Sequence, residues 1–265
     1  MTFERASRVE RLGESQSFTV DVPDGWQQGR GAFGGLVLAT LLRAIEACEP
    51  DKARAVRTLL GDLAGPVLPG SAEITVTTLR RGANQSNLRA DLRQHGQILA
   101  FASAVLSTPR NVGIPNFRPR LGKPPAPETG LVLPPGAPGA PVFLRHFEQH
   151  VTGPLPWSRG KTAEAAGWIR LREAPSVVDA PLLVAYLDSY WPAFFTVADA
   201  PRPMATISFT AEIFCDPPTL DPNAPFFYRG RTIAEHEGFQ LEERNLYDAE
   251  GVLVAANQQT FCVIK

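Results

Sequence analysis

Residues 29–48 read GRGAFGGLVLATLLRAIEAC, and this stretch decides the fold. From Gly34 onward it is mostly apolar and has few helix breakers, which predicts a helix that is covered on most of its sides. Its first six residues also fit G-x-G-x-x-G, the fingerprint of dinucleotide-binding proteins. The two features lead to different folds, and the neighbouring sequence decides between them.

The neighbouring sequence argues against a nucleotide site. The fingerprint needs a strand that runs directly into the glycine turn, whereas the turn signal PDGWQQ separates the candidate strand SFTVDV (17–22) from the glycines. The acidic residue expected about twenty positions later falls on the polar turn EPDKARAV. We therefore predict that the glycines let a buried helix begin where backbone or ligand comes close.

Bulk properties narrow the class of protein. The chain has 265 residues and a formal net charge of −1, which gives no electrostatic reason to expect nucleic acid or an anionic membrane as a partner. No apolar run approaches the length of a membrane span, and the first 15 residues lack the apolar core of a signal peptide. We expect a cytoplasmic location.

The cysteines give no sign of a metal site. Cys48, Cys215 and Cys262 are far apart in the sequence and show neither zinc-binding nor redox spacing. They are expected to be free thiols, and neither a metal nor a cofactor is expected.

Proline marks the middle of the chain. Twelve of the 25 prolines fall between Pro109 and Pro156, and such a stretch cannot form a helix or a central strand. We predict an N-terminal repeat over residues 1–109, a proline-rich linker over 110–142, and a C-terminal repeat over 143–265 that carries the active site.

The two halves show the same order of elements. Each starts with a strand candidate (17–22 and 167–173), continues with an apolar helix (34–48 and 180–194), and ends with four strand-like runs. These runs are residues 55–65, 72–82, 86–96 and 97–108 in the first half, and 204–214, 226–236, 239–251 and 252–264 in the second. This order predicts an α+β architecture of two repeats, each with a long central helix wrapped by an antiparallel sheet.

That architecture, a double hotdog, resembles the bacterial acyl-CoA thioesterase II family. Three stretches carry the resemblance: AFGGLVLATLL (32–42) at the start of the first helix, MATISFTAEIF (204–214), and DAEGVLVAANQQ (248–259). Their order and spacing, with the linker between the halves, extend the resemblance over nearly the whole chain. It implies hydrolysis of a fatty acyl-CoA thioester to the free acid and coenzyme A.

The resemblance also implies the site residues. An Asp, a Thr and a Gln hold the hydrolytic water in that family, and they correspond here to Asp188, Thr206 and Gln259. Many members have an acidic residue and a His after the Ile of the threonine strand, where this chain has Ser208 and Phe209. This departure leaves substrate preference and fine positioning open.

The residues themselves give a weaker version of the same site. Asp188 lies inside an apolar run, where a buried carboxylate needs a partner, although capping or an outward position would also explain it. Strand alternation places Asn257 and Gln259 on one face and Gln258 on the other. The first half has Ala104 in place of Gln259, which favours one site per chain, and Thr58 as the expected counterpart of Thr206.

Thioester hydrolysis also needs donors for the developing oxyanion. We expect backbone N–H groups at a helix N-terminus to supply them, with Gly34 and Gly35 as candidates. The chain has no G-x-S-x-G nucleophile elbow. His146 and His150 are four apart and would share a face of a helix, but without H-E-x-x-H they indicate a surface pair rather than a metal site.

Two alternatives remain on the same fold. A protein that binds an acyl group or acyl-CoA without catalysis would keep the fold and the pocket. A hotdog dehydratase or isomerase would need a His beside its helical acid, and neither predicted helix has one in it or near it. Because sheets of this kind leave edges that are usually covered, we also expect a homo-oligomer, a dimer or higher.

Overall fold

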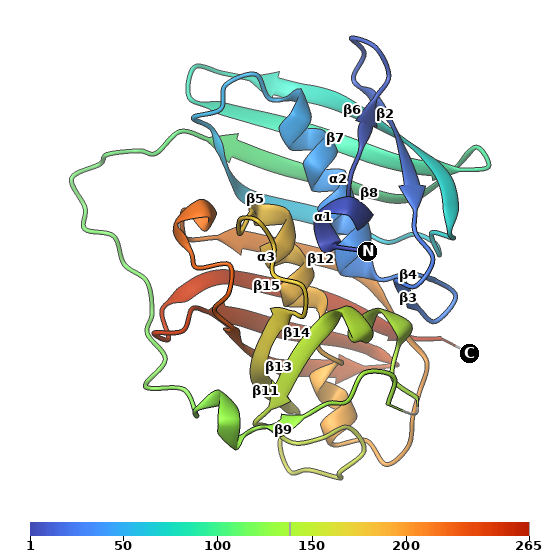
Figure 1. The fold of residues 1–265 in the computed structure, drawn as a ribbon, viewed down its shortest axis with the longest axis vertical. Helices are drawn as coiled ribbons and strands as arrows, with labels where there is room; N and C mark the ends of the chain where they lie inside the picture. Colours follow the sequence, from blue (N-terminus) through green and yellow to red (C-terminus); the bar gives the residue numbers. More distant parts are fainter. Residues whose placement is uncertain (138, 265) are drawn as a thin grey trace.

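The two halves of the chain contribute to one large antiparallel sheet. The computed structural model describes residues 1–137 and 139–264, and the first half occupies the upper part of Figure 1 and the second half the lower part. The sheet has 13 strands in the order β1-β2-β6-β7-β8-β5-β12-β15-β14-β13-β11-β10-β9, and a separate hairpin joins β3 to β4. This is the α+β arrangement predicted from the sequence.

The elements of the first half are α1 (Phe3–Ala6), β1 (Glu10–Arg11), β2 (Ser17–Val22), β3 (Gln27–Gln28), β4 (Gly31–Ala32), α2 (Gly34–Cys48), β5 (Ala55–Asp62), β6 (Gly70–Arg81), β7 (Gln85–Gln94) and β8 (Gln97–Ser107). Between the halves lie the short 3-10 helix η1 (Pro127–Thr129) and β9 (Leu131–Val132). The second half contains η2 (Val142–His146), β10 (Phe147–Val151), β11 (Glu164–Leu171), α3 (Ala180–Asp188), η3 (Ala193–Thr196), β12 (Met204–Ile213), η4 (Pro217–Thr219), β13 (Phe226–His236), β14 (Phe239–Tyr247) and β15 (Leu253–Val263).

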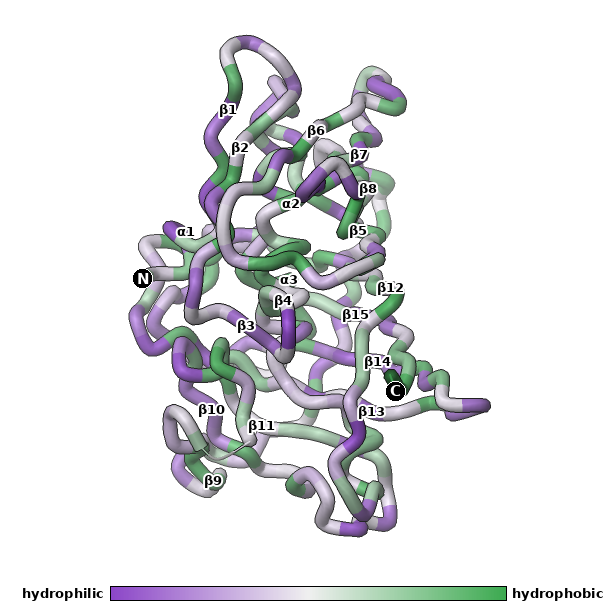
Figure 2. Tube along the Cα trace, turned by 90° about the vertical axis from the view of Figure 1, so that its right-hand side faces the viewer, coloured by the Kyte–Doolittle hydropathy of each residue, from purple (hydrophilic) through white to green (hydrophobic). Residues whose placement is uncertain are grey.

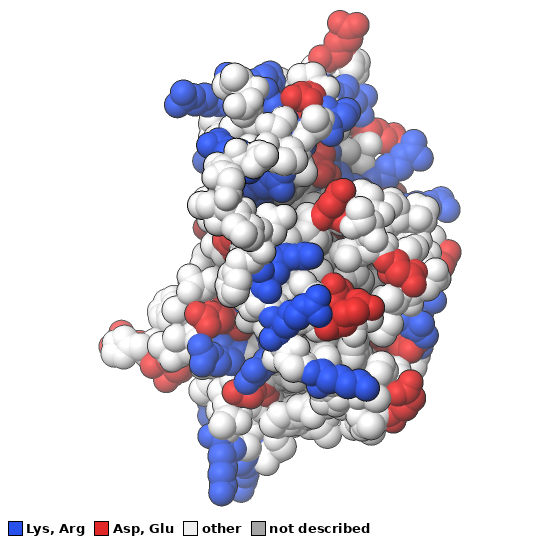
Figure 3. Space-filling view, turned by 90° about the vertical axis from the view of Figure 1, so that its left-hand side faces the viewer, with Lys and Arg blue, Asp and Glu red and all other residues white. Residues whose placement is uncertain are grey.

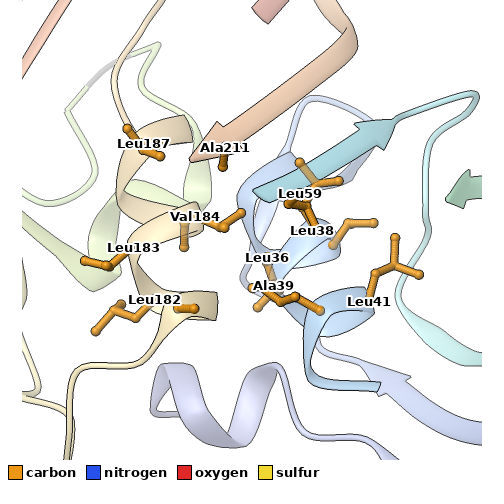
Figure 4. Packing of buried hydrophobic residues seen from close by; sticks show 14 of the residues in the cluster. Leu36, Leu38, Ala39, Leu41, Leu59, Leu182, Leu183, Val184, Leu187 and Ala211 are labelled. Atoms are coloured by element: carbon orange, nitrogen blue, oxygen red, sulfur yellow. The ribbon is translucent and has the colours of Figure 1, made fainter. Parts of the chain in front are cut away.

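The helices α2 and α3 lie against each other and against one face of the sheet. In β7, for example, every second residue is buried, which is the pattern of a strand with one face on a core. Apolar residues from both helices meet those of β5 and β12, such as Leu38, Val184, Leu59 and Ala211 in Figure 4. Figure 2 shows the same central region around α3 as hydrophobic. The core is therefore continuous between the two halves.

The central strands β5 and β12 join the halves. Their antiparallel register pairs Leu60 with Thr210, Leu59 with Ala211 and Gly61 with Phe209. On either side of this pair the strand order of the two halves is the same, β8-β7-β6-β2 on one side and β15-β14-β13-β11 on the other. The two repeats are therefore related by an approximate twofold axis through the pair of Leu60 and Thr210.

The glycine-rich turn is a hairpin that leads into α2. Gly31 lies in β4, paired with β3, and a Cβ there would come within 3.0 Å of the Pro66 Cα. The Ala32 N–H donates to the Val67 carbonyl at 2.7 Å and the Phe33 N–H to the Trp26 carbonyl at 2.8 Å. Glycine is needed here for a close backbone approach, as predicted, and the G-x-G-x-x-G match does not follow a strand of a parallel sheet.

The proline-rich segment runs outside the sheet before it returns. It is the green loop that swings away from the body in Figure 1. Its later part is attached to the second half, since Arg120 forms a bridge with Val252 and β9 pairs with β10. The limits 109/110 and 142/143 stay predictions, and β9 shows that residues 131–132 extend the sheet of the second half.

The edges of the large sheet are short. Both outermost strands, β1 and β9, contain two residues each. Short edge strands are one way in which a sheet avoids pairing with another chain, so the edge argument for self-association loses force and the oligomer stays a prediction. No helix within residues 1–137 and 139–264 is long and apolar enough to cross a membrane.

Candidate active site

Asp188 is the last residue of α3. The helix begins at the N-cap Asp179, whose Oδ1 accepts a hydrogen bond from the Leu182 N–H at 2.9 Å. It has nine residues, so the predicted helix over 180–194 is too long at its end. Pro192 disfavours helical backbone at the residue before it. As a result, Asp188 is presented at a helix end, buried with 6% of its surface exposed.

Thr206 and Gln259 approach Asp188 from two neighbouring strands. The Gln259 Nε2 donates to the Asp188 Oδ1 at 3.0 Å and to the Thr206 Oγ1 at 2.8 Å. Asn257 and Gln259 are buried while Gln258 is exposed, which confirms the predicted alternation in β15. One amide thus joins a carboxylate from a helix to a hydroxyl from β12.

The register of β12 and β15 shifts between Thr206 and Ser208. A bulge of this kind re-aims the side chains around it. Beyond it Ser208 is exposed and Phe209 is buried in the core. The two residues that depart from the family pattern therefore point to opposite sides of the sheet.

Gly34 and Gly35 bring the first half into the site. They are the first residues of α2, and a Cβ on Gly34 would lie 2.8 Å from the Asp188 Oδ2. A Cβ on Gly35 would lie 3.0 Å from the Ala185 Cα of α3. The structure therefore brings together all five residues that the sequence singled out, although they come from both halves.

The start of α2 has no side-chain cap. Its N-cap residue is Phe33, which makes no capping hydrogen bond and stacks on Phe143 of the second half at a ring distance of 4.0 Å. The amides of a first helical turn have no acceptor within the helix and carry a partial positive charge. The Gly34 and Gly35 N–H groups are therefore suited to an anion or an oxyanion.

The charge state of Asp188 reflects opposing influences. Burial raises the pKa of its carboxyl, and the Arg244 guanidinium, the Gln259 amide and the Gly35 amide lower it, in that order. Its place at the C-terminal, negative end of α3 also disfavours the anion, whereas the N-terminus of α2 favours it. The net effect is a pKa above the ordinary value for an aspartate.

Sequence reasoning missed Arg244 and Glu242 on β14. Both side chains are 1% exposed, and the Arg244 Nη1 lies 3.5 Å from the Asp188 Oδ1. The stretch FQLEERNLY is rich in polar residues, and its buried positions include Gln240, Glu242, Arg244 and Leu246. The alternation set by Leu246 was the signal, since it places the charged residues on the inner face.

The first half lacks the polar residues of this site. The register of β5 and β8 shifts between Val56 and Thr58, just as β12 and β15 shift between Thr206 and Ser208. Superposing the two bulges pairs Thr206 with Val56 and Gln259 with Ala104. The expected counterpart Thr58 is therefore wrong, because it lies on the other side of the bulge.

The opposite ends of the two helices meet in a different contact. Arg43 of α2 forms an ion pair with Asp179, the N-cap of α3, at 2.8 Å, and its Nε donates to the Ser7 Oγ at 2.7 Å. This ion pair joins α2 to the start of α3, whereas the contact of Gly34 with Asp188 joins the start of α2 to the end of α3. The fold thus has one polar constellation of the Asp–Thr–Gln kind in its described part.

The Gln259 side chain keeps a free acceptor. Both of its N–H bonds are used by Asp188 and Thr206, and its buried Oε1 has no hydrogen-bond partner within residues 1–137 and 139–264. A buried polar atom without a partner calls for an explanation, and an unseen water or ligand is one. The arrangement can orient a water beside the Asp188 carboxylate.

His146 and His150 make contacts outside the group of Asp188, Thr206 and Gln259. His146 ends η2 and stacks on Trp26 at 3.9 Å, whereas His150 lies in β10 and contacts the Pro127 carbonyl at 2.9 Å. The two histidines do not lie on one helix, since η2 ends at His146 and a strand begins at Phe147. Within the described residues, no three His, Cys, Asp or Glu side chains gather as a metal site would require.

On the face shown in Figure 3, acidic and basic side chains are interspersed.

Comparison with known proteins places the chain in a family. Sequence models of the acyl-CoA thioesterase N-terminal and C-terminal domains match residues 22–108 and 123–263. The chain belongs to the acyl-CoA thioesterase family. The predicted resemblance is confirmed. A search of curated protein sequences found no match to this chain.

Solved structures agree on the fold. A hot dog protein of unknown function from Alicyclobacillus acidocaldarius has a TM-score of 0.89 at 19% identity, over 99% of this chain and 98% of that one. A putative thioesterase II from Thermobifida fusca has 0.83 at 21% identity, over 100% and 98%. The acyl-CoA thioesterase II TesB2 from Mycobacterium marinum has 0.77 at 19% identity, over 99% and 98%. The fold of this family member is the double hotdog, as predicted, with a second helix shorter than the first.

Proposed function

We propose that the chain hydrolyses a fatty acyl-CoA thioester to the free acid and coenzyme A. One observation carries the proposal: the Gln259 amide joins the Asp188 carboxylate at 3.0 Å to the Thr206 hydroxyl at 2.8 Å. This group lies beside the uncapped start of α2. Membership of the acyl-CoA thioesterase family supports the substrate class.

In the proposed reaction Asp188 acts as the general base. A water held by the Thr206 hydroxyl and the Gln259 Oε1 gives a proton to the carboxylate and attacks the thioester carbonyl carbon. The Asp188 Oδ1 is already bonded to Gln259, so the Oδ2, on the side of Gly34, is the proton acceptor.

The carbonyl oxygen becomes an oxyanion that a backbone N–H stabilises. Gly34 is the better donor of the two glycines, because the Gly35 amide already supports the Asp188 anion. The tetrahedral intermediate then expels the thiolate of coenzyme A, which takes a proton from Asp188, and the free acid remains. The atoms balance with water as the only co-reactant.

The polar residues themselves favour an enzyme over a non-catalytic binding protein. Val56 and Ala104 occupy the matching positions in the first half, so the fold does not require Thr and Gln there. Burial of a carboxylate, an amide and an arginine costs stability that an apolar core would not lose, which favours a functional reason for these residues. A dehydratase is less well supported, because His146 and His150 are engaged elsewhere.

The first test is the release of free thiol from a panel of acyl-CoA substrates, from short to long chains. We expect turnover with at least part of the panel, and the profile over chain length would define the substrate. Tight binding of acyl-CoA without turnover would instead indicate the non-catalytic binding protein.

The pH dependence should show an acidic limb that belongs to Asp188. The base must be ionised, and burial raises the pKa of this carboxyl above its ordinary value. Activity should therefore be complete above the raised pKa and decline as the pH falls through it, at a pH above the value of about 4 for a free aspartate. The measurement is kcat/KM against pH, and a limb at or below pH ~4 would contradict the assignment.

A further inference from the structure

Arg244 lies between two buried carboxylates. Its Nε donates to the Glu242 Oε1 at 2.8 Å, and its Nη1 lies 3.5 Å from the Asp188 Oδ1. The same Nη1 donates to the Leu187 carbonyl at 3.0 Å. One guanidinium therefore contacts both the last turn of α3 and the acid at its end.

Glu242 holds the guanidinium from the other side. Its Oε2 accepts a hydrogen bond from the Ala193 N–H at 2.6 Å, at the start of η3. The pair of Arg244 and Glu242 thus fixes the chain just before and just after Asp188. Phe261, with its ring centre 5.0 Å from the guanidinium carbon, and Tyr228, at 5.8 Å, enclose the arginine.

The contact of Arg244 with Asp188 matters because few other groups favour the ionised form of this carboxyl. From α2 it meets the Gly35 amide, from β15 the Gln259 amide, and from β14 the Arg244 guanidinium. Glu242 and Tyr228 lie beyond the guanidinium and act on Arg244 in turn. Among the described residues, Arg244 is the one cation that acts on Asp188, and an unpaired buried carboxylate would be strongly disfavoured.

We propose that Arg244, held by Glu242, is a positioning residue that keeps Asp188 ionised and its Oδ2 turned toward the start of α2. The inference rests on the proposed function for its catalytic consequence. Arg244 acts through Asp188, since its Nη1 lies 3.5 Å from the Oδ1 that Gln259 also contacts, and not on the Oδ2 side proposed for the water. Glu242 has a second effect, because its carboxylate pairs with the Arg244 guanidinium at 2.8 Å and so offsets part of the positive charge that acts on Asp188.

Arg244→Gln and Glu242→Gln should therefore act in opposite directions. Loss of the cation is expected to raise the pKa of Asp188 by about one unit or more, which lowers kcat/KM roughly tenfold below the shifted limb and leaves activity at high pH. Loss of the Glu242 charge is expected to lower the pKa of Asp188 and extend activity to more acidic pH. A purely structural role predicts loss at all pH values instead.

A surface pair provides the matched control. Arg231 on β13 and Glu243 on β14 lie 3.1 Å apart and are both exposed. Exposed pairs of this kind contribute little, so Arg231→Gln should leave both the pH profile and the pKa of Asp188 unchanged.

The pKa of Asp188 is best read directly, by a ¹³C carboxylate NMR titration of the intact protein, beside the pH profile of kcat/KM. An unchanged titration in both variants would overturn the inference. If Arg244→Gln does not fold, Glu242→Gln decides: a downward shift supports it and no shift refutes it. The titration needs no turnover, so failure of this inference is distinct from failure of the proposed function, which would appear as binding of acyl-CoA without release of free thiol.

Discussion

Asp188→Asn should lower kcat for acyl-CoA hydrolysis by roughly 10²–10⁴-fold, the usual effect of losing a general base. Asparagine has nearly the same shape and can still accept a hydrogen bond from the Gln259 Nε2, which lies 3.0 Å from the Asp188 Oδ1. It cannot take a proton from water at neutral pH. The variant should therefore keep the geometry of the site and lose the general base.

The measurement is thiol release by variant and wild type, with circular dichroism to show that the variant folds. Asp21→Asn is a matched control, because Asp21 is exposed on the outer face of β2, and it should leave kcat unchanged. Hydrolysis by Asp188→Asn at the rate of the wild type would mean that the fold is right and that the site lies elsewhere.

Gly34→Ala should lower kcat by roughly a hundredfold, the effect expected of a displacement near 1 Å at a reacting group. The new Cβ would come 2.8 Å from the Asp188 Oδ2 and equally close to the Leu63 Cδ1. The carboxylate must move, and the oxyanion donor moves with the helix start. Because Asp188 and Gly34 belong to different halves, this variant tests whether the site spans both.

The stability of the Gly34→Ala protein distinguishes a change in the active site from disruption of the whole fold. Alanine is favoured over glycine within a helix by about 1 kcal/mol, which offsets part of the crowding at position 34. Gly122→Ala is a suitable control, since a Cβ there meets no atom within 4 Å. A Gly34→Ala protein with normal kcat and an unchanged melting temperature would exclude Gly34 from the site.

Local patterns in the sequence predicted the elements well. The helix over 34–48 and the strand over 17–22 begin and end as expected, because apolar spacing and turn residues mark both limits. The second helix ends at Asp188 rather than at residue 194, since its apolar run continues into η3 after Pro192. Hydropathy alone does not distinguish those two conformations.

The site was predicted in part. Asp188, Thr206 and Gln259 were placed by resemblance, and the structure brings them within hydrogen-bonding distance. Arg244 was overlooked because charged residues in a strand are normally exposed. Thr58 was predicted as the counterpart of Thr206, and the sequence pattern does not reveal the bulge that shifts the register between Val56 and Thr58. Contacts between the halves depend on the pairing of β5 with β12, which no local pattern encodes.

The contact of Asp188 with the start of α2 gives the two halves unequal freedom to change. Val56 and Ala104 show that the fold needs no polar side chain at these two positions of the first half, and an apolar side chain that fits the core can stand there. The helix start in the same half has no such latitude, because Gly34 and Gly35 leave no room for a larger residue beside α3. A library of variants at these four positions would thus show apolar replacements accepted at Val56 and Ala104 and larger residues rejected at Gly34 and Gly35.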